Sequence, residues 1–252
     1  MRLNRFLASC GLGSRRSSEA LITAGRVRVN GEPVTSPATF VTPGRDEVTV
    51  DGAPVSPPER HTYYLLHKPE GVVSTAHDPE GRPTVMSLVS PTPRVFPIGR
   101  LDQNTSGALL LTDDGELAHC ILHPRYEIDK EYDVVAEGTV SEEAVEALRH
   151  GVRLPDEPRP TAPAKVEILK RLPRRTQLRL VLHEGRKRQV RRMLEVVGHP
   201  VIQLRRVRIG PITLKGLTAG ECRELTEDEL AALRRSVRSR KPRSRRKKSH
   251  GG

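Results

Sequence analysis

The sequence predicts an α+β protein in which a small helical and hairpin unit precedes a larger domain of strands and helices. Residues 1–35 combine two short helical segments with a hairpin pattern, and six or more strand candidates follow residue 61. Between them, Ser56–Arg60 contains consecutive prolines, which favour an extended spacer. The length of 252 residues is sufficient for two modest domains. We therefore expect domains at residues 1–55 and 62–233, joined by a linker at residues 56–61.

The N-terminal segment carries clear local signals. Apolar residues share one face of a helix over Leu3–Cys10, Ser14 can cap a second helix, and Gly25 can end it. The segments VRVNGEPV, residues 27–34, and VTVDGAPV, residues 48–55, each place a two-residue turn between alternating residues. They predict two hairpins of one small sheet.

Positive charge is distributed unevenly along the chain. Ten Lys or Arg and no acidic residue lie from Arg234 to the C-terminus, so the rest of the chain carries only about +2 of the net +12. We expect residues 234–252 to form a disordered basic tail that attracts phosphates in a salt-sensitive way or simply aids solubility. The first thirty residues contain six arginines and only one acidic residue, Glu19. This second cluster favours phosphate contact over an ordinary solvated face.

Several classes of protein are disfavoured by composition. No apolar run approaches the roughly 18 residues of a membrane span, so we expect a cytoplasmic protein. Three scattered cysteines do not form a disulfide framework or a zinc site. His119 and His123 have the four-residue spacing of metal ligands, but no third ligand is evident, and we expect no metal.

One acidic side chain lies where chemistry is expected. Asp102 belongs to the polar loop GRLDQNTSG, residues 99–107, which precedes the apolar strand Ala108–Leu111. After that strand, Asp113 and Glu116 have the spacing of a capping box for a further helix. From these residues alone, Asp102 is either a site residue or a turn aspartate.

Three segments resemble known families. GRLDQNTSGALLLTDDGELA, residues 99–118, resembles the signature of bacterial ribosomal RNA pseudouridine synthases of the small-subunit synthase A and large-subunit synthase B type. The loop HDPEGRPTV, residues 77–85, is more similar to the large-subunit synthase B branch. RLNRFLASCGLGSRRSSEALITAGRVRVNG, residues 2–31, resembles the RNA-binding domain first known from ribosomal small-subunit protein four. The resemblance implies a mixed, largely antiparallel sheet with flanking helices and with Asp102 in a central cleft.

The resemblance also implies roles for individual residues. Asp102 matches the catalytic aspartate, Tyr132 matches a tyrosine whose ring packs on the target base, and Arg191 matches a basic residue that pairs with the aspartate. Ile209 matches an apolar residue of the uracil pocket. A core tyrosine remains the alternative for Tyr132. We expect RNA contacts at Arg5, Arg15, Arg16, Arg26, Arg28, Arg82, Arg100, Arg186 and Arg188.

The implied reaction converts one uridine, expected in large-subunit (23S) rRNA, to pseudouridine. The bond from sugar to ring nitrogen breaks, the base rotates, and the base rejoins through carbon five, so no metal, redox or nucleotide cofactor is needed. We expect ribosomal RNA or an assembly intermediate as partner and a monomeric protein. The alternative is a non-catalytic rRNA-binding assembly factor. An RNA methyltransferase would need a glycine-rich loop after a strand, whereas GLGS, residues 11–14, lies between two expected helices.

Overall fold

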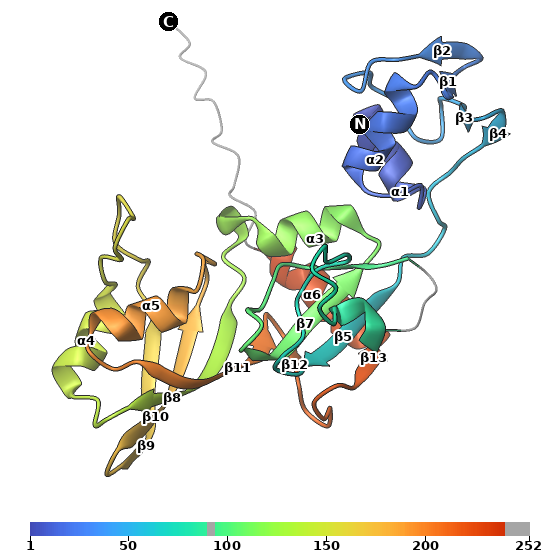
Figure 1. Ribbon diagram of the computed structural model, residues 1–252. Coiled ribbons are helices and arrows are strands. Elements are labelled where there is room, and N and C mark those ends of the chain that lie inside the picture. The colour runs from blue at the N-terminus through green and yellow to red at the C-terminus, as the bar shows by residue number, and fades with distance from the viewer. Residues whose placement is uncertain (90–93, 240–252) are drawn as a thin grey trace, which may run out of the picture. The chain divides into compact units, whose positions relative to one another are not determined.

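The computed structural model describes residues 1–89 and 94–239, which form two compact units (Figure 1). The first unit contains Met1–Thr62 and short later segments that include Thr112–Gly115, and the second begins at Tyr63. None of the helices within these ranges combines the length and the hydropathy needed to cross a bilayer.

The first unit contains two helices and a four-stranded antiparallel sheet in the order β2-β1-β3-β4. Its elements are α1 Leu3–Ser9, α2 Arg15–Thr23, β1 Val27–Val29, β2 Glu32–Val34, β3 Val48–Val50 and β4 Ala53–Pro54. Ser14 caps α2 by accepting the Ser17 N–H at 3.1 Å, as the sequence predicts. Asn30 and Gly31 have φ of 52° and 84°, the left-handed backbone that a tight hairpin turn requires. The two expected hairpins are therefore confirmed.

The second unit is built on a nine-stranded mixed sheet whose main path runs β13-β5-β7-β11-β8-β10-β9. Its strands are β5 Tyr63–Lys68, β6 Phe96–Pro97, β7 Ser106–Thr112, β8 Lys130–Glu137, β9 Lys165–Leu172, β10 Arg175–Leu182, β11 Val201–Ile209, β12 Ile212–Thr213 and β13 Cys222–Glu224. Neighbours from β11 to β9 pair antiparallel, whereas β7 runs parallel to β11. This arrangement confirms the expected α+β class with a mixed, largely antiparallel sheet.

Helices pack on both halves of this sheet (Figure 1). They are α3 Gly115–Leu122, α4 Glu142–His150, α5 Gln189–Val196 and α6 Glu227–Ser239, with short 3₁₀ turns at Val85–Leu88 and Pro124–Tyr126. Side chains of α4 and α5 share one apolar core with β8, β9, β10 and β11. Side chains of α3 and α6 share a second core with β5 and β7.

Gly107 permits the parallel contact between β7 and β11. Its φ is +119°, and a Cβ built there would lie 2.2 Å from the Arg206 carbonyl oxygen and 2.5 Å from the Arg206 nitrogen. Gly107 and Arg206 are also register partners. Any side chain at this position would separate the two strands, because backbone atoms cannot rotate away as a side chain can.

Two expectations differ from the structure. The helix after Asp113 begins at Gly115, and the Asp113 carboxylate instead accepts the Thr62 N–H at 3.0 Å. α6 extends through Ser239, because Leu230, Leu233 and Val237 bury one face of it. Residues 234–239 are therefore helical rather than part of a tail, and residues 240–252 lie outside the described range.

We predict that Gly107→Ala lowers the free energy of unfolding by about 2 to 4 kcal/mol, since it adds backbone strain and a steric overlap. Urea denaturation monitored by circular dichroism measures the change. Gly115→Ala is the matched control, because no atom lies within 4 Å of a Cβ at that position. Equal stability of the two variants would contradict the close approach of the strands.

Candidate active site

Asp102 lies in a loop that enters β7 and is fixed to a neighbouring loop. The Ser74 hydroxyl donates to the Leu101 carbonyl at 2.9 Å and accepts the Leu101 N–H at 3.1 Å. One residue beyond Asp102, the Gln103 carbonyl accepts the Gly71 N–H at 2.8 Å. The residues on both sides of Asp102 are thus held by hydrogen bonds, which presents its half-buried carboxylate in a defined position.

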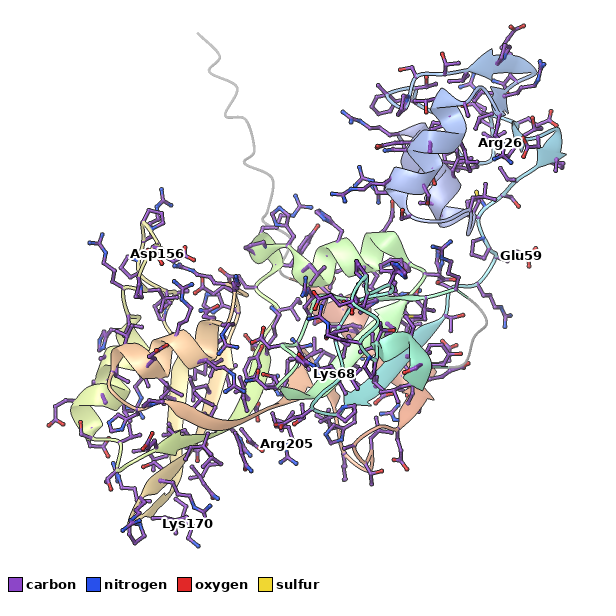
Figure 2. The ribbon with its side chains drawn as sticks, in the orientation of Figure 1. Arg26, Glu59, Lys68, Asp156, Lys170 and Arg205 are labelled. Carbon is purple, nitrogen blue, oxygen red and sulfur yellow. The ribbon has the colours of Figure 1, made fainter. Side chains whose placement is uncertain are left out.

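A buried lysine supports the same loop. Lys68, at the end of β5, has no solvent exposure and lies within the second unit (Figure 2). Its ammonium donates at 2.7 Å to the carbonyls of Pro69 and Val72 and at 3.4 Å to that of Gln103. Burial lowers the pKa of Lys68 to about 8, while the Glu70 and Asp102 carboxylates oppose this shift. The charge therefore organises backbone carbonyls next to Asp102.

Arg191 holds the other side of the loop. From α5 its Nη2 donates to the Asn104 carbonyl at 2.6 Å and contacts the Thr105 hydroxyl at 3.5 Å. Burial lowers the pKa of Arg191, Arg188 acts in the same direction, and Asp102 opposes both. The direct ion pair with Asp102 that the resemblance implies is not formed, because the guanidinium is directed to the loop backbone. Arg191 is thus a positioning residue in this structure.

Arg188 occupies the place expected for Arg191. Its Nη1 lies 3.9 Å from Asp102 Oδ2, and both side chains are partly exposed. Arg188 precedes α5 with φ of 50°, a left-handed conformation that is unfavourable for a residue with a side chain. Asp102 and Arg188 line an open pocket of roughly 570 Å³ together with Glu70, Gly71, Gln103 and Asn104. The pocket thus places the Asp102 carboxylate beside a partly exposed guanidinium.

The left-handed turn at Arg188 is braced by neighbouring segments. Arg186 donates to the carbonyls of Arg159 and Pro160 at 2.8 and 2.6 Å. Gln189 accepts the Arg186 N–H at 3.0 Å and donates to Glu184. Because its guanidinium makes these contacts within the protein, Arg186 is better explained as a brace than as an RNA contact.

Tyr132 and Ile209 do not line the pocket around Asp102. Tyr132 lies on β8 between Leu180 and Arg206 and packs partly against the core beneath α4 and α5. Ile209 is 2% exposed and belongs to the core beneath α3 and α6. Ile209 is thus a core residue in this structure, whereas Tyr132, for which a core position was the alternative, is half-buried.

The remaining arginines expected to contact RNA differ in their exposure and in their contacts within the protein. Arg26 pairs with Asp51, and Arg82 pairs with Asp78 and Glu80. The Arg28 guanidinium donates to the Gly31 carbonyl at 2.9 Å. Arg5 is half-buried, and Arg15, Arg16 and Arg100 are exposed.

Sequence reasoning missed Lys68 as a site residue. The signal was present, because Lys68 closes the segment TYYLLHK, whose apolar residues predict a strand buried on both faces. A lysine at such a position is rarely buried without a specific set of acceptors.

Comparisons with known proteins agree with this architecture. Residues 62–196 match the family model described as RNA pseudouridylate synthase, and residues 1–48 match the S4 domain. The ribosomal large subunit pseudouridine synthase B of Bacillus subtilis is 46% identical over 92% of this chain and 95% of that protein. An uncharacterised RNA pseudouridine synthase of Aquifex aeolicus is 44% identical over 94% of this chain and 95% of that protein. A crystal structure of a pseudouridylate synthase aligns with a TM-score of 0.68 at 33% identity, over 92% of this chain and 99% of that one.

These similarities define an isomerase that acts on uridines of RNA and carries an S4 domain at its N-terminus. The chain belongs to the RNA pseudouridine synthase family.

We predict that Lys68→Met lowers the free energy of unfolding at pH 7 by about 2 kcal/mol, because buried carbonyls lose their donor. Since the folded-state pKa of about 8 lies below the ordinary 10.5, the unfolded chain binds the extra proton between these values. The stability of the wild type relative to the variant should therefore rise as pH increases from 8 to 10.5. Urea titrations of both proteins across this range measure it, and a constant difference would refute the lowered pKa of Lys68.

Proposed function

We propose that this protein is an rRNA pseudouridine synthase that isomerises one uridine of large-subunit (23S) rRNA with Asp102 as its nucleophile. The names of relatives support the ribosomal target. Besides the Bacillus protein, the ribosomal large subunit pseudouridine synthase B of Pseudomonas aeruginosa is 42% identical over 94% of this chain and 62% of that protein. The observation that carries the proposal is the Asp102 carboxylate, 3.9 Å from Arg188 in an open pocket.

The chemistry requires an ionised carboxylate beside the sugar. Asp102 either attacks the anomeric carbon or assists loss of the base, and both routes use its negative charge. The Arg188 guanidinium lies 3.9 Å from that carboxylate, and it is exposed enough to follow an incoming phosphate instead. The buried cations Lys68 and Arg191 fix the loop before substrate arrives, which reduces the reorganisation that accompanies reaction.

RNA binding must supply the free energy for exposing the target base. Flipping a base out of a stack costs a few kcal/mol, which phosphate contacts and stacking offset. We assign stacking to the half-buried Tyr132 and phosphate contacts to the exposed Arg15 and Arg16 of the first unit. We retain the cytoplasm as the predicted compartment, since ribosomal RNA is found there.

We predict that Asp102→Asn reduces pseudouridine formation by at least about 10⁴-fold while RNA binding persists, because the amide keeps the shape and loses the charge. Large- and small-subunit rRNA are incubated with each protein, and pseudouridine is located by chemical labelling and primer extension. Asp156→Asn is the matched control, since Asp156 is exposed and its φ of 63° suits asparagine.

A single site modified by the wild type and the control, and absent with Asp102→Asn, supports the proposal. Modification confined to small-subunit rRNA would overturn the proposal that the target uridine lies in large-subunit rRNA. Tight binding with no modification of any rRNA would instead favour a non-catalytic assembly factor.

We also predict that the double variant Arg15→Ser with Arg16→Ser raises the RNA concentration at half-maximal rate without changing the rate at saturation. The slope of binding against salt should fall by about 2, one for each lost phosphate contact. Arg171→Ser is the control, since Arg171 is an exposed arginine of β9 that pairs with Glu142. An unchanged half-saturation would exclude this surface of α2 as an RNA contact.

A further inference from the structure

Two buried cations flank Tyr132 on one face of the sheet. Arg206 on β11 is the register partner of Tyr132 on β8, and Lys130 lies two residues before Tyr132 on the same strand face. Arg206 is 4% exposed and Lys130 is 9% exposed. Across the sheet, Arg206 is also the partner of Gly107, five residues beyond Asp102. Arg206 therefore lies at the end of β7 into which the Asp102 loop leads.

Neither cation forms a salt bridge within the described ranges, although the charges of Asp129 and Glu184 act on Lys130 from a longer distance. Arg206 Nε donates to the Ala108 carbonyl at 2.8 Å, but its Nη2 is buried without any hydrogen-bond partner. The Lys130 ammonium has one hydrogen bond among the described residues, a long one of 3.3 Å to the Ile128 carbonyl. The arginines on the opposite face of β11 do form ion pairs. Arg205 pairs with Asp133 at 3.1 Å, and Arg208 pairs with Glu131 at 2.5 Å.

An unpaired buried cation is unfavourable by several kcal/mol unless an anion or a strong acceptor completes it. Here the desolvation has already occurred in the folded protein, so an acceptor that enters beside Tyr132 gains the full hydrogen bond. An RNA phosphate is charged, strongly hydrated and joined to two riboses, so its entry into an apolar interior is unfavourable. The carbonyl oxygens of a flat pyrimidine ring enter with little polar surface, and they fit this setting better.

We propose that Arg206 and Lys130 are further catalytic residues, which contact the carbonyl oxygens of the flipped uracil and stabilise the negative charge on the ring when its bond to the sugar breaks. This inference rests on the proposed function, in that it assumes a uridine presented to Asp102.

The electron balance explains why such a site is needed. Heterolysis of the bond between C1′ and N1 leaves both electrons on the ring, where they delocalise over N1 and the two carbonyl oxygens. The sugar carbon is satisfied by the Asp102 carboxylate or by loss of a proton from C2′. After rotation, C5 attacks C1′ with an electron pair of the ring and displaces the Asp102 carboxylate, or it adds to the glycal while C2′ regains its proton. C5 then loses its proton and N1 gains one. The ring is thus an anion only between cleavage and rejoining, which is when preorganised cations lower the barrier.

The charge of Lys130 depends on its surroundings. Burial and then the Arg206 charge lower the pKa of Lys130 to about 8, while Asp129 and Glu184 oppose them. These groups face Lys130 from β11, from the residue before β8 and from the loop before α5. The ammonium is therefore charged at neutral pH and loses its charge as pH rises past 8.

The first test compares adjacent arginines on opposite faces of β11. Arg206→Met should lower the single-turnover rate at saturating RNA by about 100-fold, the loss typical of one oxyanion donor, with unchanged RNA affinity. Arg205→Met, which loses only its contact with Asp133, should react as the wild type does. The substrate is the RNA fragment that carries the uridine modified by the wild type. Thermal unfolding of each variant verifies that it is folded.

A second measurement separates charge stabilisation from a structural role. Fluorine at C5 of the target uridine stabilises the ring anion, so the defect of Arg206→Met should be much smaller with 5-fluorouridine. The reaction is then followed as loss of the N-linked nucleoside, because C5 carries no hydrogen.

For Lys130→Arg, the rate relative to wild type should rise between pH 7 and 9, since arginine keeps its charge.

Three results would overturn the assignment: a wild-type rate for Arg206→Met, an equal defect on both nucleosides, or a flat ratio for Lys130→Arg. Each leaves the proposed function intact as long as Asp102→Asn remains inactive. If the wild type modifies no uridine, the proposed function fails first, and the assignment of Arg206 and Lys130 fails with it.

Discussion

The geometry of the site depends on positive charges buried against backbone carbonyls. Lys68 from β5 and Arg191 from α5 direct their charges to the carbonyls of Gln103 and Asn104, on one side of Asp102 in the chain. Charged donors form the stronger class of hydrogen bond, and a low-dielectric setting strengthens them further. Among the described residues, the carboxylate itself forms one ion contact, with Arg188 at 3.9 Å. The backbone of the loop is therefore held in place, while the carboxylate that we propose as the nucleophile stays partly exposed.

The alternation of a β-strand separates two electrostatic environments on β8 and β11. Glu131 and Asp133 lie on one face of β8, where arginines of neighbouring strands pair with them. Tyr132 lies on the other face beside Arg206, where no carboxylate forms a pair within the described residues. Alternate residues of these strands therefore lie in different environments. On one face the arginines are neutralised by carboxylates, and on the other the charge of Arg206 is not paired.

Much of the fold follows from local sequence signals, and much of the site does not. The hairpins and the cap at Ser14 depend on neighbouring residues, so they were predictable. The Arg188 contact depends on a left-handed residue before α5, and Asp113 binds Thr62 from far along the chain. Neither can be inferred from spacing alone. For α6, the basic residues suggested a tail, although the spacing of Leu230, Leu233 and Val237 already indicated a helix face.

The parallel pairing of β7 with β11 has a consequence for biosynthesis. Residues 106 and 205 are register partners, so the strand that carries Arg206 is synthesised about a hundred residues after the Asp102 loop. A hairpin such as β9 with β10 forms from neighbouring segments, whereas this contact requires closure of a long loop and forms slowly. Asp102 therefore acquires the support of Arg191 only after α5 has been synthesised, and the support of the β11 register only after Ile209. The loop around Asp102 is thus encoded early in the chain and receives its long-range contacts late in synthesis.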